Sequence, residues 1–251
     1  MNLKISIITA TYNSAKTIES TIQSVLSQTY PNIEHIIIDG ASKDSTQEIA
    51  QNFQNHHPSI RYISELDKGI YDALNKGVQL ASGHIIGFLH SDDFFESERV
   101  VEEIINSFQS KNYDGVYGDL RYVSSENTTK VFRYWKSRDF DSGLIKNGWM
   151  PAHPTLFLKK EVYKKHGLFD LNFKIAADYD FMLRILKDES LAFSYLPLVI
   201  TNMRVGGASN SFGNLVLKMK EDWKALRKNK IPFRTKTLFL KNVSKIKQFV
   251  K

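Results

Sequence analysis

The chain has 251 residues and no cysteine, which excludes disulfide bonds, zinc–thiolate sites and thiol catalysis, and its length suits one large α/β domain or two small ones. Residues 218–251 carry twelve basic and two acidic residues, a net charge of +10, whereas residues 1–217 carry 22 basic and 25 acidic residues, a net charge of −3. Enzymes that act on nucleic acid more often have positive charge around the active cleft, so this distribution argues against a nucleic-acid partner.

The beginning of the chain bears on its location in the cell. The sequence runs from Met1 directly into a short apolar stretch, which leaves no room for a signal peptide. No segment approaches the roughly 20 apolar residues of a membrane span. The sequence therefore predicts a cytoplasmic protein, free or attached to the inner face of the cytoplasmic membrane from its surface.

Short apolar runs alternate with helical patterns through the first half of the chain. Strands that are apolar on both faces and alternate with helices are typical of a parallel sheet built from βα units. The predicted strands are Leu3–Ile8, Ile33–Ile38, Ile60–Ile63, His84–Leu89 and Gly115–Tyr117, and the predicted helices are Ala15–Gln28, Ser45–Phe53, Ile70–Leu80 and Val100–Phe108. This pattern predicts a nucleotide-binding lobe over residues 1–118.

The second half has a mixed pattern. Leu120–Tyr134 alternates between apolar and polar residues around the turn-like Ser124–Asn127, which indicates an antiparallel hairpin. Further predicted elements are the strands Thr155–Leu158, Phe193–Tyr195 and Val199–Met203 and the helices Asp178–Lys187 and Phe212–Asn229. No linker rich in Pro or Gly separates independent domains. We therefore predict a single domain over residues 1–212, with an acceptor-side lobe over 119–212, followed by a helical tail over 213–251.

Polar residues follow each of the first four predicted strands, where ligands of open parallel sheets bind. These segments are Thr9–Asn13, Asp39–Asp44, Glu65–Gly69 and His90–Asp93. Three of the four carry carboxylates, and carboxylates that converge on one edge indicate a hard cation held by oxygen ligands. Asp44 precedes a helix and is better explained as a cap. The adjacent Asp92 and Asp93 would repel each other without a cation.

Four motifs, in matching order and spacing, resemble glycosyltransferase family 2, whose members have the GT-A fold. They are Ile5–Ser14 for the opening strand and loop, Ile36–Thr46 for the second-strand motif, Leu89–Asp93 for the metal motif and Ala177–Arg184 for the catalytic-base motif. The resemblance covers roughly residues 3–205. Within it, Asp67–Gly77 is similar to the members that assemble bacterial surface polysaccharides.

The resemblance implies an α/β fold of the GT-A type and an inverting, metal-dependent enzyme. Such an enzyme moves a hexosyl or N-acetylhexosaminyl group from a nucleotide-diphosphate donor, typically a UDP-sugar, to a hydroxyl of a glycan or lipid-linked glycan. The implied residues are Thr9, Ala10, Thr11, Tyr12, Asp39, Asp67 and Asp92 for the donor nucleotide, Asp93 for Mn²⁺ or Mg²⁺, Asp178 as general base, and His153 and Arg204 for acceptor or phosphate. The family often has Asp at the position of Ser91 and Glu at that of Ala177.

The chemistry of sugar transfer calls for the same kinds of residue. Negative charge grows on the leaving diphosphate, and a divalent cation there is worth several kcal/mol as a Lewis acid. The attacking hydroxyl must lose a proton, and a carboxylate base contributes about 10²–10⁴ in rate. One base and a direct displacement invert the anomeric configuration, as in inverting glycosidases.

Structural roles compete with these assignments. Asp178 opens a predicted helix and could serve only as its cap. His153 lies in a loop where packing is the alternative to a contact with acceptor or metal. Gly206–Ser209 is expected to be a lid that closes on the diphosphate, with a simple turn as the alternative.

Other functions require features that differ from these. A nucleotidyltransferase usually has a Gly-rich basic loop after the first strand, and Thr9–Asn13 has neither property. A dinucleotide-dependent oxidoreductase needs a G-x-G-x-x-G turn there, which is absent. A non-catalytic sugar- or nucleotide-binding protein would not need both Asp93 and Asp178.

The tail combines charge with helical periodicity. The apolar stripe consists of Phe239, Val243, Ile246 and Val250, and its basic neighbours are Lys236, Lys241, Lys245, Lys247 and Lys251. A basic amphipathic helix of this kind is typical of proteins that bind an anionic membrane surface. The alternative is that the stripe packs on the body of the chain or on a second copy in a homodimer.

Overall fold

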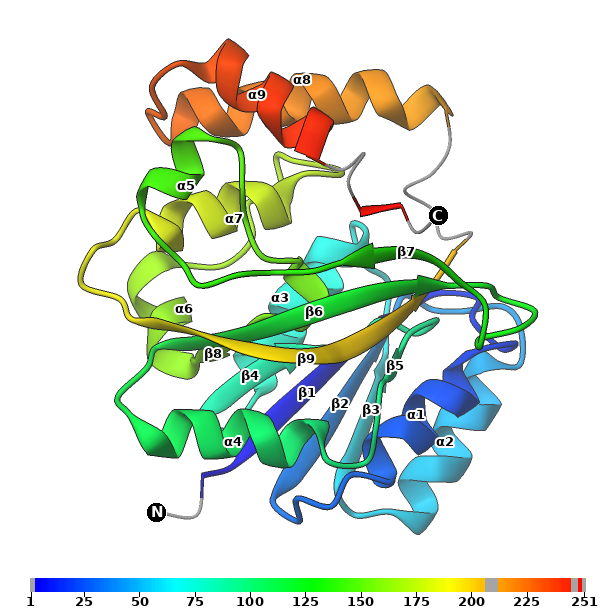
Figure 1. Ribbon diagram of the computed structural model, residues 1–251. Helices are drawn as coiled ribbons and strands as arrows, with labels where there is room; N and C mark the ends of the chain where they lie inside the picture. Colours follow the sequence, from blue (N-terminus) through cyan, green and yellow to red (C-terminus); the bar gives the residue numbers. More distant parts are fainter. Residues whose placement is uncertain (1–2, 206–211, 245–247, 250–251) are drawn as a thin grey trace.

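The strands of the protein form one mixed sheet with helices on both faces (Figure 1), as a computed structural model of residues 3–205, 212–244 and 248–249 shows. The strands are β1 (Ile5–Thr11), β2 (Ile33–Asp39), β3 (Ile60–Ser64), β4 (Ile85–Phe88), β5 (Phe94–Phe95), β6 (Gly115–Val123), β7 (Val131–Trp135), β8 (Phe157–Lys159) and β9 (Phe193–Arg204). Their order is β3-β2-β1-β4-β8-β6-β9-β5, with β7 paired to β6. The predicted α/β class is confirmed.

The first four strands are parallel, as predicted from their alternation with helices. In the shared register Thr11 lies opposite Asp39, and Asp39 lies opposite Ser64. The carboxyl ends of β1, β2 and β3 therefore meet at one edge of the sheet. β8 pairs antiparallel with both β4 and β6. The strand direction therefore reverses next to β4, the strand that precedes the Asp92–Asp93 segment.

Two pairs of predicted segments are single strands in the structure. Gly115–Tyr117 and the first arm of the predicted hairpin form β6, so residue 118 lies inside a strand. The two predicted strands after residue 192 form β9, which runs parallel to β6. Pro197 interrupts the apolar pattern there. The register between β6 and β9 shifts on either side of Asp119. A proline is tolerated at such an irregularity because the regular ladder of hydrogen bonds is already interrupted there.

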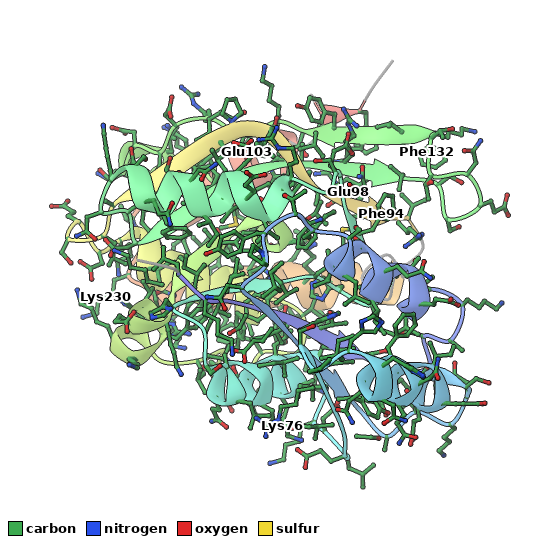
Figure 2. All side chains as sticks on the ribbon, turned by 90° about the horizontal axis from the view of Figure 1, so that it is seen from below. Lys76, Phe94, Glu98, Glu103, Phe132 and Lys230 are labelled. Carbon is green, nitrogen blue, oxygen red and sulfur yellow. The ribbon has the colours of Figure 1, made fainter. Side chains whose placement is uncertain are left out.

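The helices cover the two faces of the sheet in distinct groups. They are α1 (Ile18–Leu26), α2 (Thr46–His56), α3 (Ile70–Leu80), α4 (Val100–Ser110), α5 (Gly143–Lys146), the 3₁₀ helix η1 (His153–Thr155), α6 (Lys160–His166), α7 (Ala177–Leu186), α8 (Phe212–Lys228) and α9 (Arg234–Ser244). Leu74 of α3 and Leu226 of α8 belong to the core on one face, and Ile104 of α4 belongs to the core on the other. Figure 2 shows Lys76 of α3 and Glu103 of α4 on opposite sides of the sheet. α5 and α6 are not among the predicted helices.

The C-terminal helices pack on the body of the protein rather than standing apart from it. Glu221 of α8 is buried and accepts hydrogen bonds of 2.8–3.0 Å from three successive backbone N–H groups, those of residues 174–176, just before α7. On α9 the Thr237 hydroxyl donates to the Lys146 carbonyl at 2.9 Å. In the described parts of the chain, no helix combines the length and apolarity needed to cross a membrane.

The predicted membrane-binding tail is corrected at one of its basic residues. Lys241 is buried: its ammonium lies 2.7 Å from the Asp222 carboxylate and 3.3 Å from the centre of the Tyr179 ring, so it stabilises the protein interior and cannot reach a membrane. Phe239 and Val243 are exposed, as the stripe requires. Outside the described residues lie the other two members of the stripe, Ile246 and Val250, and the basic neighbours Lys245, Lys247 and Lys251.

We expect Lys241→Ala to lower the free energy of unfolding by about 3–5 kcal/mol, because it leaves the Asp222 carboxylate buried without its ion-pair partner. Urea unfolding followed by circular dichroism measures this change. Lys236→Ala, at an exposed position on the same helix, serves as the control and should stay within about 0.5 kcal/mol of the unmodified protein. Equal stability of the two variants would contradict a structural role for Lys241.

Candidate active site

The loops that follow β1, β2 and β4 are joined to one another by hydrogen bonds. The Asn13 backbone N–H donates to the Ser42 hydroxyl at 2.8 Å, and the Ser14 and Ser91 hydroxyls lie 2.8 Å apart. Asn13 has a φ of 50° and Ala41 a φ of 59°, so a left-handed residue shapes each of the first two loops. The polar segments predicted to converge therefore do converge, and Ser91 serves as a link between two of them.

Asp39 organises the loop after β2. It is fully buried and accepts from the Ser42 hydroxyl and N–H, from the Ser64 hydroxyl at 2.6 Å and from the Tyr62 hydroxyl at 3.1 Å. Burial, with a smaller contribution from Asp39, raises the pKa of Tyr62 to about 12. Both oxygens of Asp39 are thus held by protein donors, which fixes the shape of the edge where a nucleotide is predicted to bind.

The other predicted nucleotide residues differ in how open they are. Thr9 is buried in β1, and its hydroxyl donates to the Leu89 carbonyl at 2.7 Å and lies 2.9 Å from His35. Ala10 is also buried in β1. Thr11 has a buried hydroxyl with no hydrogen-bond partner among the described residues, whereas Tyr12 is 59% exposed.

Asp67 closes the same edge from the loop after β3. Its carboxylate accepts from the Gly69 N–H at 2.8 Å. It also lies against Gly40, where a Cβ atom would come within 2.6 Å of the Asp67 carboxylate. The absence of a side chain at Gly40 therefore lets the loops after β2 and β3 approach each other.

The second acidic group consists of Asp92 and Asp93. Asp93 is fully buried, and one of its oxygens, Oδ1, accepts from the Arg204 backbone N–H at 3.2 Å. Its other oxygen, Oδ2, is buried with no hydrogen-bond partner in the described part of the chain. Burial, together with the charge of Asp92, raises the pKa of Asp93 well above its usual range. A buried carboxylate with an unused oxygen beside a second carboxylate fits a divalent cation.

Arg204 brings β9 to this acidic group. Its guanidinium donates to the Asp92 carbonyl at 2.6 Å and to the Ser20 hydroxyl at 3.1 Å, and it lies 4.8 Å from the centre of the Phe94 ring. No group of three or more His, Asp or Glu side chains with metal-binding geometry occurs within the described ranges. A cation held by Asp92 and Asp93 would need further oxygen ligands besides these two carboxylates.

Asp178 lies in the first turn of α7 and is half-buried. One of its oxygens, Oδ1, accepts from the Tyr71 hydroxyl at 3.0 Å and from the Tyr179 N–H at 2.8 Å. The Tyr71 hydroxyl is also 2.6 Å from the Ile175 carbonyl. Burial, followed by the charge of Asp178, raises the pKa of Tyr71, which is therefore a hydrogen-bond donor at neutral pH. The carboxylate is held by one oxygen, and the other is not engaged by any described residue.

Two imidazoles stand near Asp178 and Asp92. The ring centres of His90 and His153 are 6.5 Å apart, and His153 is stacked on Phe88 at 5.2 Å. His90 Nδ1 and His153 Nε2 are buried with no hydrogen-bond partner in the described part of the protein. Burial lowers the pKa of both groups, that of His153 to about 4. Both rings are therefore neutral at pH 7 and can hydrogen-bond to uncharged hydroxyls.

Sequence reasoning identified His153 but not His90 or Tyr71. His90 is the first residue of the polar segment after β4, and this position alone marks it as a candidate site residue. Tyr71 lies in the motif Asp67–Gly77, but its contact with Asp178 spans 107 positions and has no local signature.

We expect Tyr71→Phe to lower kcat about fivefold with an unchanged KM for the donor, because one hydrogen bond that orients Asp178 is lost. The free energy of unfolding should fall by about 1 kcal/mol, since the Ile175 carbonyl loses its donor. Steady-state kinetics and thermal unfolding measure the two effects separately. Loss of stability with no change in kcat would show that Tyr71 has only a structural role.

Solved glycosyltransferases share this arrangement of sheet and helices. S. aureus TarS 1–349 in complex with UDP-GlcNAc has a TM-score of 0.70 and 17% sequence identity, over 90% of this chain and 65% of that chain. Mannosyltransferase PcManGT from Pyrobaculum calidifontis, in complex with GDP-Man and Mn²⁺, has a TM-score of 0.65 and 18% identity, over 95% and 70%. The chain spans less than two thirds of the TarS chain. The protein has the GT-A fold, as the sequence predicts.

Sequence comparisons assign the family. The family model for Glycosyl transferase family 2 matches residues 6–167. A PGL/p-HBAD biosynthesis glycosyltransferase of Mycobacterium bovis is 30% identical over 209 residues, which are 82% of this chain and 79% of that protein. An uncharacterized glycosyltransferase of Rickettsia typhi is 30% identical over 230 residues, 88% of this chain and 70% of that protein. The chain belongs to glycosyltransferase family 2, and the predicted resemblance is confirmed.

The predicted lid, Gly206–Ser209, lies outside the described residues. Of the other predicted site residues, Asp39, Asp67, Asp92, Asp93 and Arg204 lie at or just after the carboxyl ends of strands, whereas Asp178 lies in α7 and His153 in η1.

Proposed function

We propose that the protein is an inverting glycosyltransferase that moves a hexosyl or N-acetylhexosaminyl group from a UDP-sugar to a hydroxyl of a glycan or lipid-linked glycan. The observation that carries the proposal is the buried Asp93 carboxylate, whose unused oxygen lies beside Asp92 at the edge of a parallel sheet. TarS in complex with UDP-GlcNAc and PcManGT in complex with GDP-Man and Mn²⁺ share the fold and support a nucleotide-sugar donor. The mycobacterial relative, a PGL/p-HBAD biosynthesis glycosyltransferase, supports a biosynthetic role.

The roles of the residues follow from their positions. Asp93 and Asp92 would hold Mn²⁺ or Mg²⁺, which when bound supplies Lewis-acid stabilisation to the leaving diphosphate. Arg204, already held against Asp92, adds a positive charge beside the same group. Asp178 takes the proton of the attacking acceptor hydroxyl through its unengaged oxygen, while Tyr71 and the Tyr179 N–H fix its orientation. One displacement with one base inverts the anomeric centre.

The remaining assignments concern the two substrates. Tyr12 is exposed at the loop after β1 and is suited to pack on a base or ribose, and Asp39 and Asp67 shape the same edge. The neutral rings of His90 and His153 are suited to hydrogen-bond to sugar hydroxyls and, being uncharged, do not repel the cation. Residues 1–212 would form the catalytic domain, with a donor lobe over 1–118 and an acceptor lobe over 119–212. A lipid-linked acceptor would place the enzyme at the inner face of the cytoplasmic membrane.

A thermal-shift screen of UDP-, GDP- and ADP-sugars with and without MnCl₂ tests the proposal. We expect a UDP-sugar to raise Tm in the presence of Mn²⁺, because a ligand that binds only the folded state stabilises it. Slow hydrolysis of the same donor should then release UDP. A nucleotidyltransferase would instead release pyrophosphate, and a non-catalytic binding protein would show the shift without turnover. No shift with any nucleotide sugar would contradict the proposal.

A further inference from the structure

Exposed apolar side chains of this protein concentrate on the C-terminal helices. Among the described residues, six of the twelve large hydrophobic side chains that are exposed lie within residues 216–243, so this short region holds half of them. They are Val216, Met219, Trp223, Phe233, Phe239 and Val243. The three on α8 follow one another at spacings of three and four and so share one helix face. The opposite face of α8 is buried through Glu221 and Ala225, and no described residue covers the exposed face.

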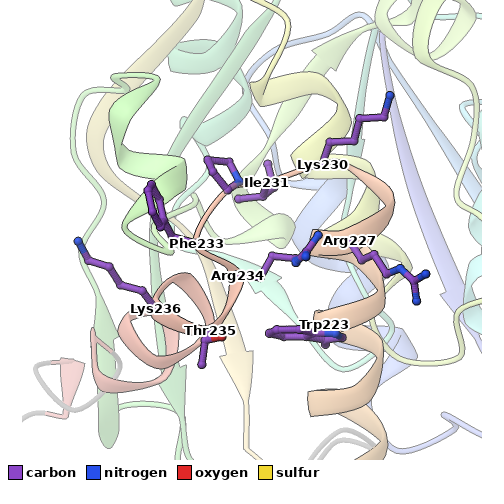
Figure 3. Close-up of a pocket in the computed structure, with 9 residues that line it drawn as sticks. Trp223, Arg227, Lys230, Ile231, Phe233, Arg234, Thr235 and Lys236 are labelled. Atoms are coloured by element: carbon purple, nitrogen blue, oxygen red, sulfur yellow. The ribbon is translucent and has the colours of Figure 1, made fainter.

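Basic side chains surround the connection between α8 and α9. A pocket of about 580 Å³ there is lined by Trp223, Phe233 and four basic residues. The four basic residues are Arg227, Lys230, Arg234 and Lys236. Figure 3 shows Arg234 extending towards Trp223 and Arg227 of α8, and Phe233 and Lys236 on the other side of the turn. The guanidinium of Arg234 lies 5.6 Å from the centre of the Trp223 ring.

The four basic residues around this pocket have no acidic partners among the described residues. Within the described ranges, none of the four basic residues forms an ion pair with Asp or Glu. The two acidic residues of the region both point inward: Glu221 holds the backbone before α7, and Asp222 pairs with Lys241. The positive charge of the outer surface is therefore uncompensated and calls for an anionic partner.

The turn between the helices is built to present Phe233. Ile231 is buried and its N–H donates to the Leu226 carbonyl at 3.0 Å, which anchors the turn. Lys230 and Phe233 have φ values of 55° and 52°, a left-handed conformation that residues other than Gly and Asn seldom adopt. Phe233 is nevertheless 75% exposed. The fold thus keeps the Phe233 ring exposed to solvent, and an exposed ring at a turn is well placed to insert into an apolar phase.

We infer that this surface, consisting of Trp223, Arg227, Lys230, Phe233, Arg234 and Lys236, docks the enzyme on an anionic lipid bilayer. Basic side chains attract the charged headgroups, and aromatic side chains insert at the boundary between headgroups and acyl chains. An acidic protein or a nucleic acid would match the charge but leave the apolar side chains of both helices uncovered. The inference deepens the proposed function, since it explains how the enzyme would reach a lipid-linked acceptor.

Co-sedimentation with vesicles tests the inference on the full chain. One set of vesicles contains phosphatidylglycerol and phosphatidylcholine in equal parts, and the other contains phosphatidylcholine alone. We expect binding to the anionic set only, weakened at high salt. The triple variant R227Q/R234Q/K236Q should bind more weakly by roughly a hundredfold, at about fivefold per charge. A matched control, R61Q/K111Q/R138Q, removes three exposed charges elsewhere and should bind like the unmodified protein.

The variant Phe233→Asn tests the contribution of the inserted aromatic ring separately from that of the basic side chains. Asn tolerates the left-handed backbone, so the variant should remain folded, and Tm checks this. We expect it to bind anionic vesicles about tenfold more weakly, since an inserted aromatic ring is lost. Equal binding by the unmodified protein, the triple variant and the control would overturn the inference. A dimer in solution that Phe233→Asn dissociates would also overturn it, by assigning the surface to a second copy.

Failure of this inference and failure of the proposed function can be told apart. Vesicle binding does not require turnover, and hydrolysis of a soluble UDP-sugar does not require vesicles. The triple variant should therefore keep the basal hydrolysis rate of the unmodified protein. Absence of hydrolysis in the unmodified protein would count against the proposed function alone.

Discussion

Asp178→Asn should lower kcat about 10²-fold or more, while donor binding and stability stay close to those of the unmodified protein. The structure explains why the two effects separate. Oδ1 of Asp178 accepts from the Tyr71 hydroxyl and the Tyr179 N–H, and the Asn side-chain oxygen can accept both. What the amide cannot do is take a proton from an acceptor hydroxyl. The substitution therefore preserves the shape and removes the base.

Single-turnover kinetics with a saturating donor measure this prediction, with Tm as the stability readout. Asp180→Asn is the matched control, because Asp180 lies one half-turn away on α7 and is buried among Arg184, Lys228 and Asn229. It should lower stability and leave kcat largely unchanged in the folded fraction. If Asp178→Asn retains the full rate, Asp178 is only a helix cap. If stability falls together with the rate, the structural role gains support.

The parallel part of the sheet could be predicted because its information is local. Isoleucine-rich runs that are apolar on both faces predict buried parallel strands, and the structure has them at β1 to β4. The pairing of β8 between β4 and β6, and of β9 with β6, depends on contacts between distant segments. No short window of sequence contains that information, so the second half could be predicted as elements but not as a topology.

The candidate site shows the same division. Asp92 and Asp93 were found because adjacent carboxylates after a buried strand are costly without a cation. The internal role of Lys241 was missed because its partner, Asp222, lies one helix earlier and looks exposed in a region of high positive charge. Thr9 illustrates the reverse case: it follows the predicted strand Leu3–Ile8 but lies inside β1, and its hydroxyl already contacts His35 and Leu89.

Asp93→Asn should abolish metal-dependent turnover, with a loss of about 10³-fold, because the Lewis-acid contribution of the cation is worth several kcal/mol. Asn keeps the acceptor for the Arg204 N–H but removes the buried charge. Burial and the charge of Asp92 already disfavour the ionised form of Asp93, as its raised pKa shows. Without metal, the variant should therefore be as stable as the unmodified protein or more stable.

The metal dependence of stability gives a test that does not rely on activity. Adding Mn²⁺ in the presence of UDP should raise Tm of the unmodified protein further and leave that of Asp93→Asn unchanged. Asp119→Asn is the opposite control: Asp119 is equally buried, but its carboxylate accepts from Ser137, Tyr134 and Tyr195. That variant should lose stability and keep its response to Mn²⁺, because its carboxylate has a structural role. Two outcomes would contradict a metal at Asp93: turnover in Asp93→Asn at the normal rate, or activity of the unmodified enzyme that EDTA does not diminish. The unpartnered oxygen of Asp93 would then have no explanation.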